Sequence, residues 1–161
     1  MAGIEARLSA LGLQLPAPIR LPPGVKLGFP WVRVHGDRAY VSGHGALAPD
    51  GSLAPLLGKV GQELTEEQGY QAARLTGLAI LASLKQALGD LDRITAWLRA
   101  FGMVNAAPSF NRYPLVINGF TDLIVEVFGL ERGAHSRSAV GMAGLPFGLA
   151  VEIEAEVAIQ Q

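Results

Sequence analysis

The chain has 161 residues, no cysteine and a net charge of −1, and only 17% of its residues are charged while half are hydrophobic. The absence of cysteine excludes disulfides, thiolate catalysis and cysteine-bound metals. The chain also lacks the excess of positive charge that binding to the phosphates of nucleic acid requires. So few charges on a chain of this size predict that some apolar surface is buried between subunits.

The first 27 residues are predicted to be an extension, and residues 28–161 are predicted to form the main domain. A short amphipathic helix is expected near residues 3–11, and the connector over 12–28 should be irregular because it is rich in Pro and Gly. No basic stretch precedes an apolar one at the start, so we expect no secretory leader and a cytoplasmic location. The uncharged apolar run 75–84 is too short to span a bilayer.

Two short strands are predicted next, over 31–36 and 38–47, because Gly36-Asp37 is a hairpin dipeptide. A turn is predicted at 48–53. Thr65 and Gln68 then form the sequence pattern of a capping box, which predicts a helix start. The helix should bury a face of leucines spaced by three and four and should end at Gly89; these leucines are Leu78, Leu81, Leu84 and Leu88.

A strand is predicted over 94–106, a second helix over 114–129, and two last strands over 137–142 and 150–159. The second helix should end at Gly129, with an inner face made of Leu115, Gly119, Leu123 and Val127. The order β-β-α-β-α-β-β predicts an α+β sandwich, with one mixed sheet and two long helices on one face. The other face then needs a cover, and a neighbouring subunit is the simplest one.

The last strand alternates strictly, with Glu152, Glu154 and Glu156 on one face. If residues 137–159 form a hairpin centred on Gly144-Leu145, Arg137 lies opposite Glu152. The pair is then either an ordinary cross-strand ion pair or a ligand site. In the second reading, Arg137 presents its planar fork to a carboxylate and Glu152 holds a water.

The stretch YVSGHG (40–45), near the end of this predicted strand, contains Ser42, Gly43, His44 and Gly45. Its small residues would let a ligand approach the backbone closely. A plain strand-end turn is the alternative. The three histidines show no metal-ligand spacing, so we expect no metal site.

The C-terminal block RSAVGMAGLPFGLAVEIEAEVA (137–158) joins an Arg-Ser pair, an apolar strand, Leu-Pro and an alternating acidic strand. It resembles the signature of the RidA (YjgF) family of reactive-intermediate deaminases. The segments YVSGHGALAPDGSL (40–53) and VINGF (116–120) resemble two further parts of that family. The resemblance implies a chorismate-mutase-like fold, a homotrimer, and ligand clefts between subunits.

The resemblance also implies a reaction. Arg137 would bind the carboxylate of a small 2-imino or 2-enamino acid, and Glu152 and the region of Ser42 would place the attacking water. Ammonia would leave, and no metal or organic cofactor would be needed. Orientation and a positioned water supply most of what an electrophilic imine carbon requires.

The same resemblance assigns substrate contacts to Phe29, Gly43, His44, Asn118 and Ala139. Phe29 stands where the family usually has Tyr, His44 where Gln is usual, and Ala139 where Cys is frequent, so a divergent branch is expected. Phe29 should make the cleft more apolar and favour bulky hydrophobic imino acids.

A second function remains open, namely a non-catalytic protein that binds a small carboxylate in the same cleft. A ribonuclease is disfavoured by the charge balance, and a chorismate mutase is disfavoured because likeness of fold does not carry chemistry. With either function, the expected partners are a small carboxylate and two further copies of the chain. We expect the protein to bind neither nucleic acid nor a membrane.

Overall fold

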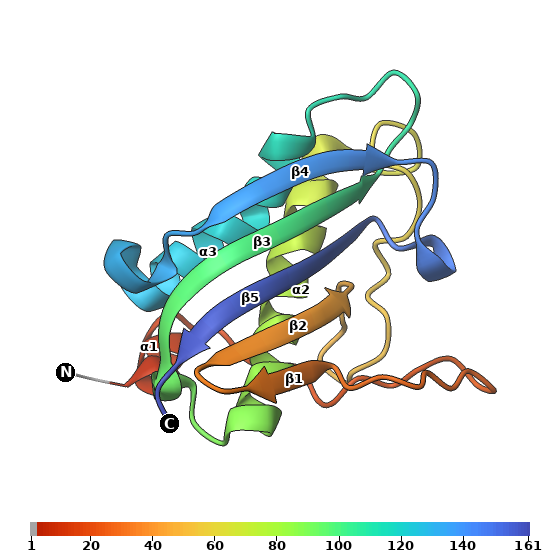
Figure 1. Ribbon diagram of the computed structural model, residues 1–161. Coiled ribbons are helices and arrows are strands. Elements are labelled where there is room, and N and C mark those ends of the chain that lie inside the picture. The colour runs from red at the N-terminus through yellow and green to blue at the C-terminus, as the bar shows by residue number, and fades with distance from the viewer. Residues whose placement is uncertain (1–2) are drawn as a thin grey trace.

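The computed structural model describes residues 3–161 and contains one mixed five-stranded sheet in the order β1-β2-β5-β3-β4 (Figure 1). Residues 1–2 of the expected extension lie outside the described residues. The strands are β1 (Val32–His35), β2 (Arg38–His44), β3 (Ile94–Asn105), β4 (Ser136–Met142) and β5 (Val151–Ile159). The α-helices are α1 (Ile4–Ala10), α2 (Glu66–Leu88) and α3 (Tyr113–Gly133), and the short 3₁₀ turns are η1 (Leu91–Arg93) and η2 (Pro146–Gly148). The predicted α+β fold, with both long helices on one face of the sheet, is confirmed.

α2 begins and ends where its sequence predicts. The Thr65 hydroxyl accepts a hydrogen bond from the Gln68 amide at 3.1 Å, and the Gln68 side chain accepts one from the Thr65 amide at 2.9 Å. Gly89 ends the helix at φ 78°, a conformation that costs little without a Cβ. The predicted leucine face is buried; it comprises Leu78, Leu81, Leu84 and Leu88.

α3 differs from its prediction in one part of its inner face. Gly119 touches α2 so closely that a Cβ there would lie 2.0 Å from the Tyr70 carbonyl oxygen. Leu115 is 38% exposed, and its assignment to the inner face was wrong. α3 packs against both α2 and the sheet, so its buried stripe is wider than a narrow seam; it includes Val116, Ile117, Phe120, Leu123, Ile124 and Val127. Gly129 breaks the helical backbone at φ 76°, and one more turn follows it.

By length and composition α3 could cross a membrane. Its large apolar side chains, however, pack in the core of this domain against Trp97 of β3 and against α2. Burial within the fold therefore accounts for the hydropathy of this helix.

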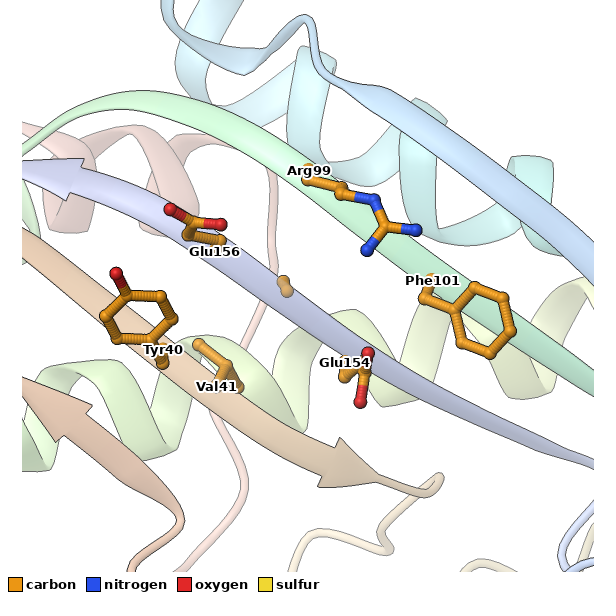
Figure 2. Close-up of a pocket in the computed structure, with 7 residues that line it drawn as sticks. Tyr40, Val41, Arg99, Phe101, Glu154 and Glu156 are labelled. Carbon is orange, nitrogen blue, oxygen red and sulfur yellow. The ribbon is translucent and has the colours of Figure 1, made fainter.

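β5 alternates as predicted. Its odd-numbered residues Val151, Ile153 and Val157 are buried toward the helices, and its glutamates point to the open face. Figure 2 shows two of those glutamates, Glu154 and Glu156, beside Tyr40, Arg99 and Phe101 in a shallow depression on that face. Neither long helix covers this side of the sheet (Figure 1).

The hairpin predicted between the last two strands was wrong. β4 pairs with β3 in parallel and β5 pairs with β3 antiparallel, so β3 lies between them. Arg137 is opposite Ala100, whereas Glu152 is opposite Met103. The helical crossover from β3 through α3 returns the chain parallel to β3 on one side, and β5 takes the remaining side of β3.

The register also separates Arg137 from Glu152 across the sheet. Ala100 is buried against the helices and pairs with both Arg137 and Ala155. Because paired residues share a face, Arg137 lies on the helix side. Glu152 follows the opposite alternation and lies on the open side.

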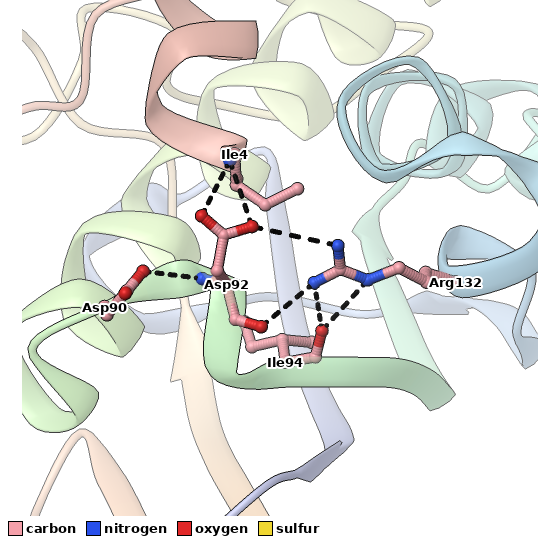
Figure 3. Close-up of polar contacts among 5 residues, drawn as sticks. All are labelled: Ile4, Asp90, Asp92, Ile94 and Arg132. Atoms are coloured by element: carbon pink, nitrogen blue, oxygen red, sulfur yellow. Dashed lines mark hydrogen bonds and ion pairs between the residues drawn. The ribbon is translucent and has the colours of Figure 1, made fainter. Parts of the chain in front are cut away.

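α1 is joined to the domain by Asp92, whose two carboxylate oxygens share the N–H of Ile4, at 3.2 and 3.0 Å from its nitrogen (Figure 3). Arg132 lies 3.9 Å from the same carboxylate and also donates to the carbonyl oxygens of Asp92 and Ile94. Ile4 and Leu8 are buried in the main core. The helix of the N-terminal segment thus shares one core with the strands.

Candidate functional site

The predicted site residues gather in two groups. The first group, which we call the acid half-site, consists of Glu152 and of residues that lie near it or at the end of β2. These residues are Phe29, Ser42, Gly43 and His44. We call Asn118, Arg137 and Ala139 the arginine half-site, which lies between α3 and β4. A single chain does not bring the two half-sites together, because the sheet separates Arg137 from Glu152.

The acid half-site borders a pocket of about 290 Å³. Glu152 and His44 are the polar side chains at its wall. The rest of the lining is apolar or glycine; its large side chains are Ile19, Leu21, Pro22, Leu27, Phe29, Trp31, Leu47, Leu53, Pro146, Phe147 and Leu149. Within residues 3–161 no three His, Asp or Glu side chains are placed to share a metal ion.

Glu152 has the chemistry of an acid-base group. A Cβ at Gly43 would lie 2.2 Å from its Oε1, so the carboxylate occupies the space that glycine leaves. Burial raises the pKa of Glu152, and the neighbouring Glu154 raises it further. A carboxyl group with a raised pKa can both take and return a proton nearer to neutral pH.

His44 is neutral and has both ring nitrogens engaged. Nδ1 lies 2.5 Å from the Ser42 carbonyl oxygen and must donate, so Nε2 accepts from the Ser83 hydroxyl at 2.8 Å. Burial lowers the pKa of His44 to about 4. The imidazole therefore offers the pocket a ring face and no free nitrogen, and its ring packs on Trp31 at 5.1 Å.

Ser42 acts on the neighbouring chain segment. Its hydroxyl donates to the Pro30 carbonyl oxygen at 2.9 Å, and its amide donates to the Trp31 carbonyl oxygen at 3.0 Å. These bonds hold the Phe29–Trp31 segment along β2, with the Phe29 ring edge-on to Trp31 at 5.2 Å.

Arg137 is held by three acceptors, none of them charged. Nη1 donates to the Thr121 hydroxyl at 2.9 Å, and Nη2 donates to the Asn118 Oδ1 at 2.7 Å and to the Pro114 carbonyl oxygen at 3.0 Å. Burial lowers the pKa of Arg137, against an opposing effect of Asp122. No carboxylate in residues 3–161 forms an ion pair with it. A half-buried guanidinium that forms no ion pair can accommodate the carboxylate of a ligand.

Thr121 and His135 complete this support, and the sequence reasoning missed both. His135 Nδ1 donates to the Gly133 carbonyl oxygen at 2.7 Å, so its Nε2 accepts from the Thr121 hydroxyl at 3.1 Å. Because the Thr121 hydroxyl proton is directed to His135, the Thr121 oxygen accepts the hydrogen bond from Arg137. A signal was present, since Thr121 follows Asn118 by three residues and therefore lies on the same helix face.

Ala139 lies two residues beyond Arg137 on the same face of β4, opposite Gly102. It packs against the core as a partly buried side chain. The structure therefore brings Asn118 and Arg137 into direct contact and places Ala139 beside them along the strand.

Comparisons with known proteins agree with this architecture. A family model described as "YjgF/chorismate mutase-like, putative endoribonuclease" matches residues 5–151. Protein TCP17 of Trypanosoma cruzi is 38% identical over 154 residues, which cover 96% of this chain and 92% of that protein.

Two solved structures are similar over almost the whole chain. The protein Atu1372 of Agrobacterium tumefaciens, of unknown function, has a TM-score of 0.84 at 40% identity and covers 98% of this chain and 92% of its own. A protein of Shewanella oneidensis MR-1, also named a "putative endoribonuclease", has a TM-score of 0.88 at 31% identity and covers 98% and 100%.

Proposed function

Because the chain belongs to the YjgF/chorismate mutase-like family, we propose that it hydrolyses small 2-imino and 2-enamino acids to 2-keto acids and ammonia. The observation that carries this proposal is Arg137, a half-buried guanidinium that is held by three neutral acceptors and forms no ion pair with a carboxylate in the described residues. Such a group fits the carboxylate that every 2-imino acid carries.

The reaction uses the two half-sites in turn. Arg137 binds the carboxylate, and Glu152 takes a proton from a water as its oxygen attacks the C=N carbon. Glu152 passes this proton to the nitrogen, which gives the carbinolamine. Glu152 then takes the hydroxyl proton of the carbinolamine and delivers it to the amino group, so the C–N bond breaks and ammonia leaves as the C=O bond forms. The enamine tautomer enters the same path once its carbon gains a proton and its nitrogen loses one, which gives the imine. The raised pKa of Glu152 suits both proton transfers.

The proposed site lies between two copies of the chain in a homotrimer. Two observations support this arrangement: Arg137 and Glu152 lie on opposite faces of the sheet of one chain, and the open face carries apolar groups such as Tyr40 and Phe101 (Figure 2). If the open face of one copy packs against its neighbours, Glu152 of one copy can approach Arg137 of the next.

The test is the release of ammonia and keto acid from freshly generated 2-aminoacrylate. We expect Arg137→Ala to abolish turnover and to weaken pyruvate binding by about 2–5 kcal/mol, because a desolvated charged pair is lost. Arg137→Lys should fail largely as well, since an ammonium cannot form the planar fork. Arg7→Ala, which removes an exposed arginine from α1, is the control. Wild-type affinity for pyruvate in Arg137→Ala would make Arg137 purely structural.

A second candidate is a protein that binds small carboxylates without catalysis, and Phe29 favours it because its ring has no hydroxyl to offer a substrate. Pyruvate binding without release of ammonia from any imine would support this reading. Ribonuclease activity, which the family description mentions, finds less physical support. The chain has 13 basic against 14 acidic residues, whereas RNA binding rests on neutralised phosphates.

A further inference from the structure

The N-terminal segment builds one wall of the pocket beside Glu152. Leu21, Leu27 and Phe29 come from the segment before β1, and Phe147 comes from η2, just before β5. The volume of 290 Å³ lies at the lower end of the range for small-molecule sites. Segments that are distant in the sequence therefore meet to enclose space for one small group.

Exposed apolar side chains concentrate at this pocket. Eight large apolar side chains are exposed in the part of the chain that the structure describes, and three of them line it. These three are Leu27 at 42%, Phe29 at 46% and Phe147 at 47% exposure. A concave apolar surface of this kind is typical of a ligand site.

The backbone of Phe147 adds an independent observation. At φ 56° it is the only non-glycine residue with a positive φ among residues 3–161, and an aromatic residue adopts this conformation at a cost in free energy. The turn is held by a 2.7 Å hydrogen bond from the Gly58 amide to the Gly148 carbonyl oxygen and by a bridge between Leu57 and Leu149. A glycine would fit position 147 without strain, so the ring itself is what the turn presents to the pocket.

We propose that this pocket receives the apolar substituent of the substrate and selects 2-imino acids with branched aliphatic or aromatic side chains over the smallest ones. This inference rests on the proposed function for the placement of the reacting carbon at Glu152. Glu152 is the only charged side chain in the lining, and His44 is neutral there. An acidic substituent would meet the Glu152 charge, and any polar substituent would lose its hydration without a partner.

The first measurement compares kcat/KM for imines generated in place by an amino acid oxidase from alanine, leucine and phenylalanine. We expect the leucine- and phenylalanine-derived imines to be preferred by about tenfold or more, since each methylene in an apolar pocket contributes substantially. Leu27→Ser and Phe147→Gly should lower that preference toward unity. Phe147→Gly also relieves the positive φ, so it removes the ring without adding backbone strain. Leu130→Ser, at a position on α3 that is 72% exposed, is the matched control.

Binding of the product keto acids gives a readout that does not depend on catalysis. Calorimetry should show tighter binding of 4-methyl-2-oxopentanoate than of pyruvate, and Leu27→Ser and Phe147→Gly should remove the difference. If no imine is hydrolysed but this difference holds, the proposed function fails and the pocket assignment stands. If the imines are hydrolysed with equal kcat/KM, or if the two keto acids bind with equal affinity, the pocket assignment is wrong. This conclusion holds whether or not the protein hydrolyses imines.

Discussion

At the scale of single residues, the central feature is how the orientation of Arg137 is maintained. Its fork is fixed by the side chains of Thr121 and Asn118 and by one carbonyl group. The Thr121 hydroxyl is itself oriented by His135, because that hydroxyl must donate to the only unprotonated ring nitrogen. Thr121 is therefore a positioning residue, which acts through Arg137 without reaching the ligand.

Thr121→Val should weaken pyruvate binding by about 1–3 kcal/mol, the cost of leaving buried polar groups without partners. The loss should be smaller than in Arg137→Ala. Thr76→Val is the matched control, since Thr76 is a buried helix threonine that bonds only the Ala72 carbonyl oxygen at 2.7 Å. It should lower thermal stability without changing affinity. Equal affinities in wild type and Thr121→Val would remove the positioning role.

His44 should make stability depend on pH. Burial lowers its folded pKa to about 4 from the usual 6.5, so between these values the unfolded chain binds a proton that the folded chain does not. The free energy of unfolding therefore carries the full contribution of the neutral His44 above pH 6.5. This contribution, about 3 kcal/mol, is lost as the pH falls toward 4.

Urea denaturation at pH 7 and pH 4.5 measures this effect as a difference between variants. His44→Gln should lose less stability than wild type on acidification, because glutamine does not titrate. His35→Gln, at an exposed position of β1, should behave as wild type. An identical pH dependence in His44→Gln would show that His44 titrates normally.

At the scale of elements, the packing of α1 depends on a few polar bonds. Asp92 accepts from the first helical amide of α1 and lies next to Arg132, which also donates to the carbonyl oxygen of Ile94 at the start of β3 (Figure 3). The helix has seven residues, too few to be stable alone in water. Tertiary contacts must therefore keep it folded.

Asp92→Ala should cost about 1–2 kcal/mol of unfolding free energy, as expected for loss of a helix cap. Hydrogen exchange of the amides in Ile4–Ala10 should accelerate, while exchange in α2 stays slow. Asp50→Ala, which removes a carboxylate that bonds Ser52 in an exposed turn, is the control. Unchanged exchange in α1 would show that burial of Ile4 and Leu8 is sufficient to hold it.

At the scale of the whole molecule, the open face of the sheet is the feature that a single chain does not explain. The long helices cover the other face, and the open one carries Tyr40 and Phe101 among charged groups (Figure 2). Apolar side chains in such a setting favour association. The separation of Arg137 from Glu152 makes the same assembly a condition for the proposed reaction.

We expect light scattering to give a trimer at micromolar concentration. Phe101→Glu should dissociate it and remove activity, because it adds a carboxylate beside Glu154 on the open face, and packing of that face against a neighbour would desolvate both charges. Leu130→Glu, on the far end of α3, should remain trimeric and active. A monomeric wild type would contradict both the assembly and the shared cleft.

The sequence by itself determined the local elements of this protein. The capping box at Thr65 and the stop at Gly89 bounded α2, and the strict alternation from Val151 to Ile159 assigned the two faces of β5, because these signals lie within a few residues of the structure that they specify. The resemblance of the C-terminal block to a known family also named Arg137 and Asn118, which do contact each other.

Only the tertiary structure decided which strands are neighbours. Gly144-Leu145 suggested a hairpin between the last two strands. Instead, α3 returns the chain so that β4 pairs in parallel with one side of β3, and β5 pairs with the other side of β3. Arg137 and Glu152 are therefore not neighbours. The apolar pocket likewise needs Leu21, Leu27, Glu152 and Phe147 from distant segments. Strand order and pocket walls depend on how whole elements pack, and no short stretch of sequence carries that information.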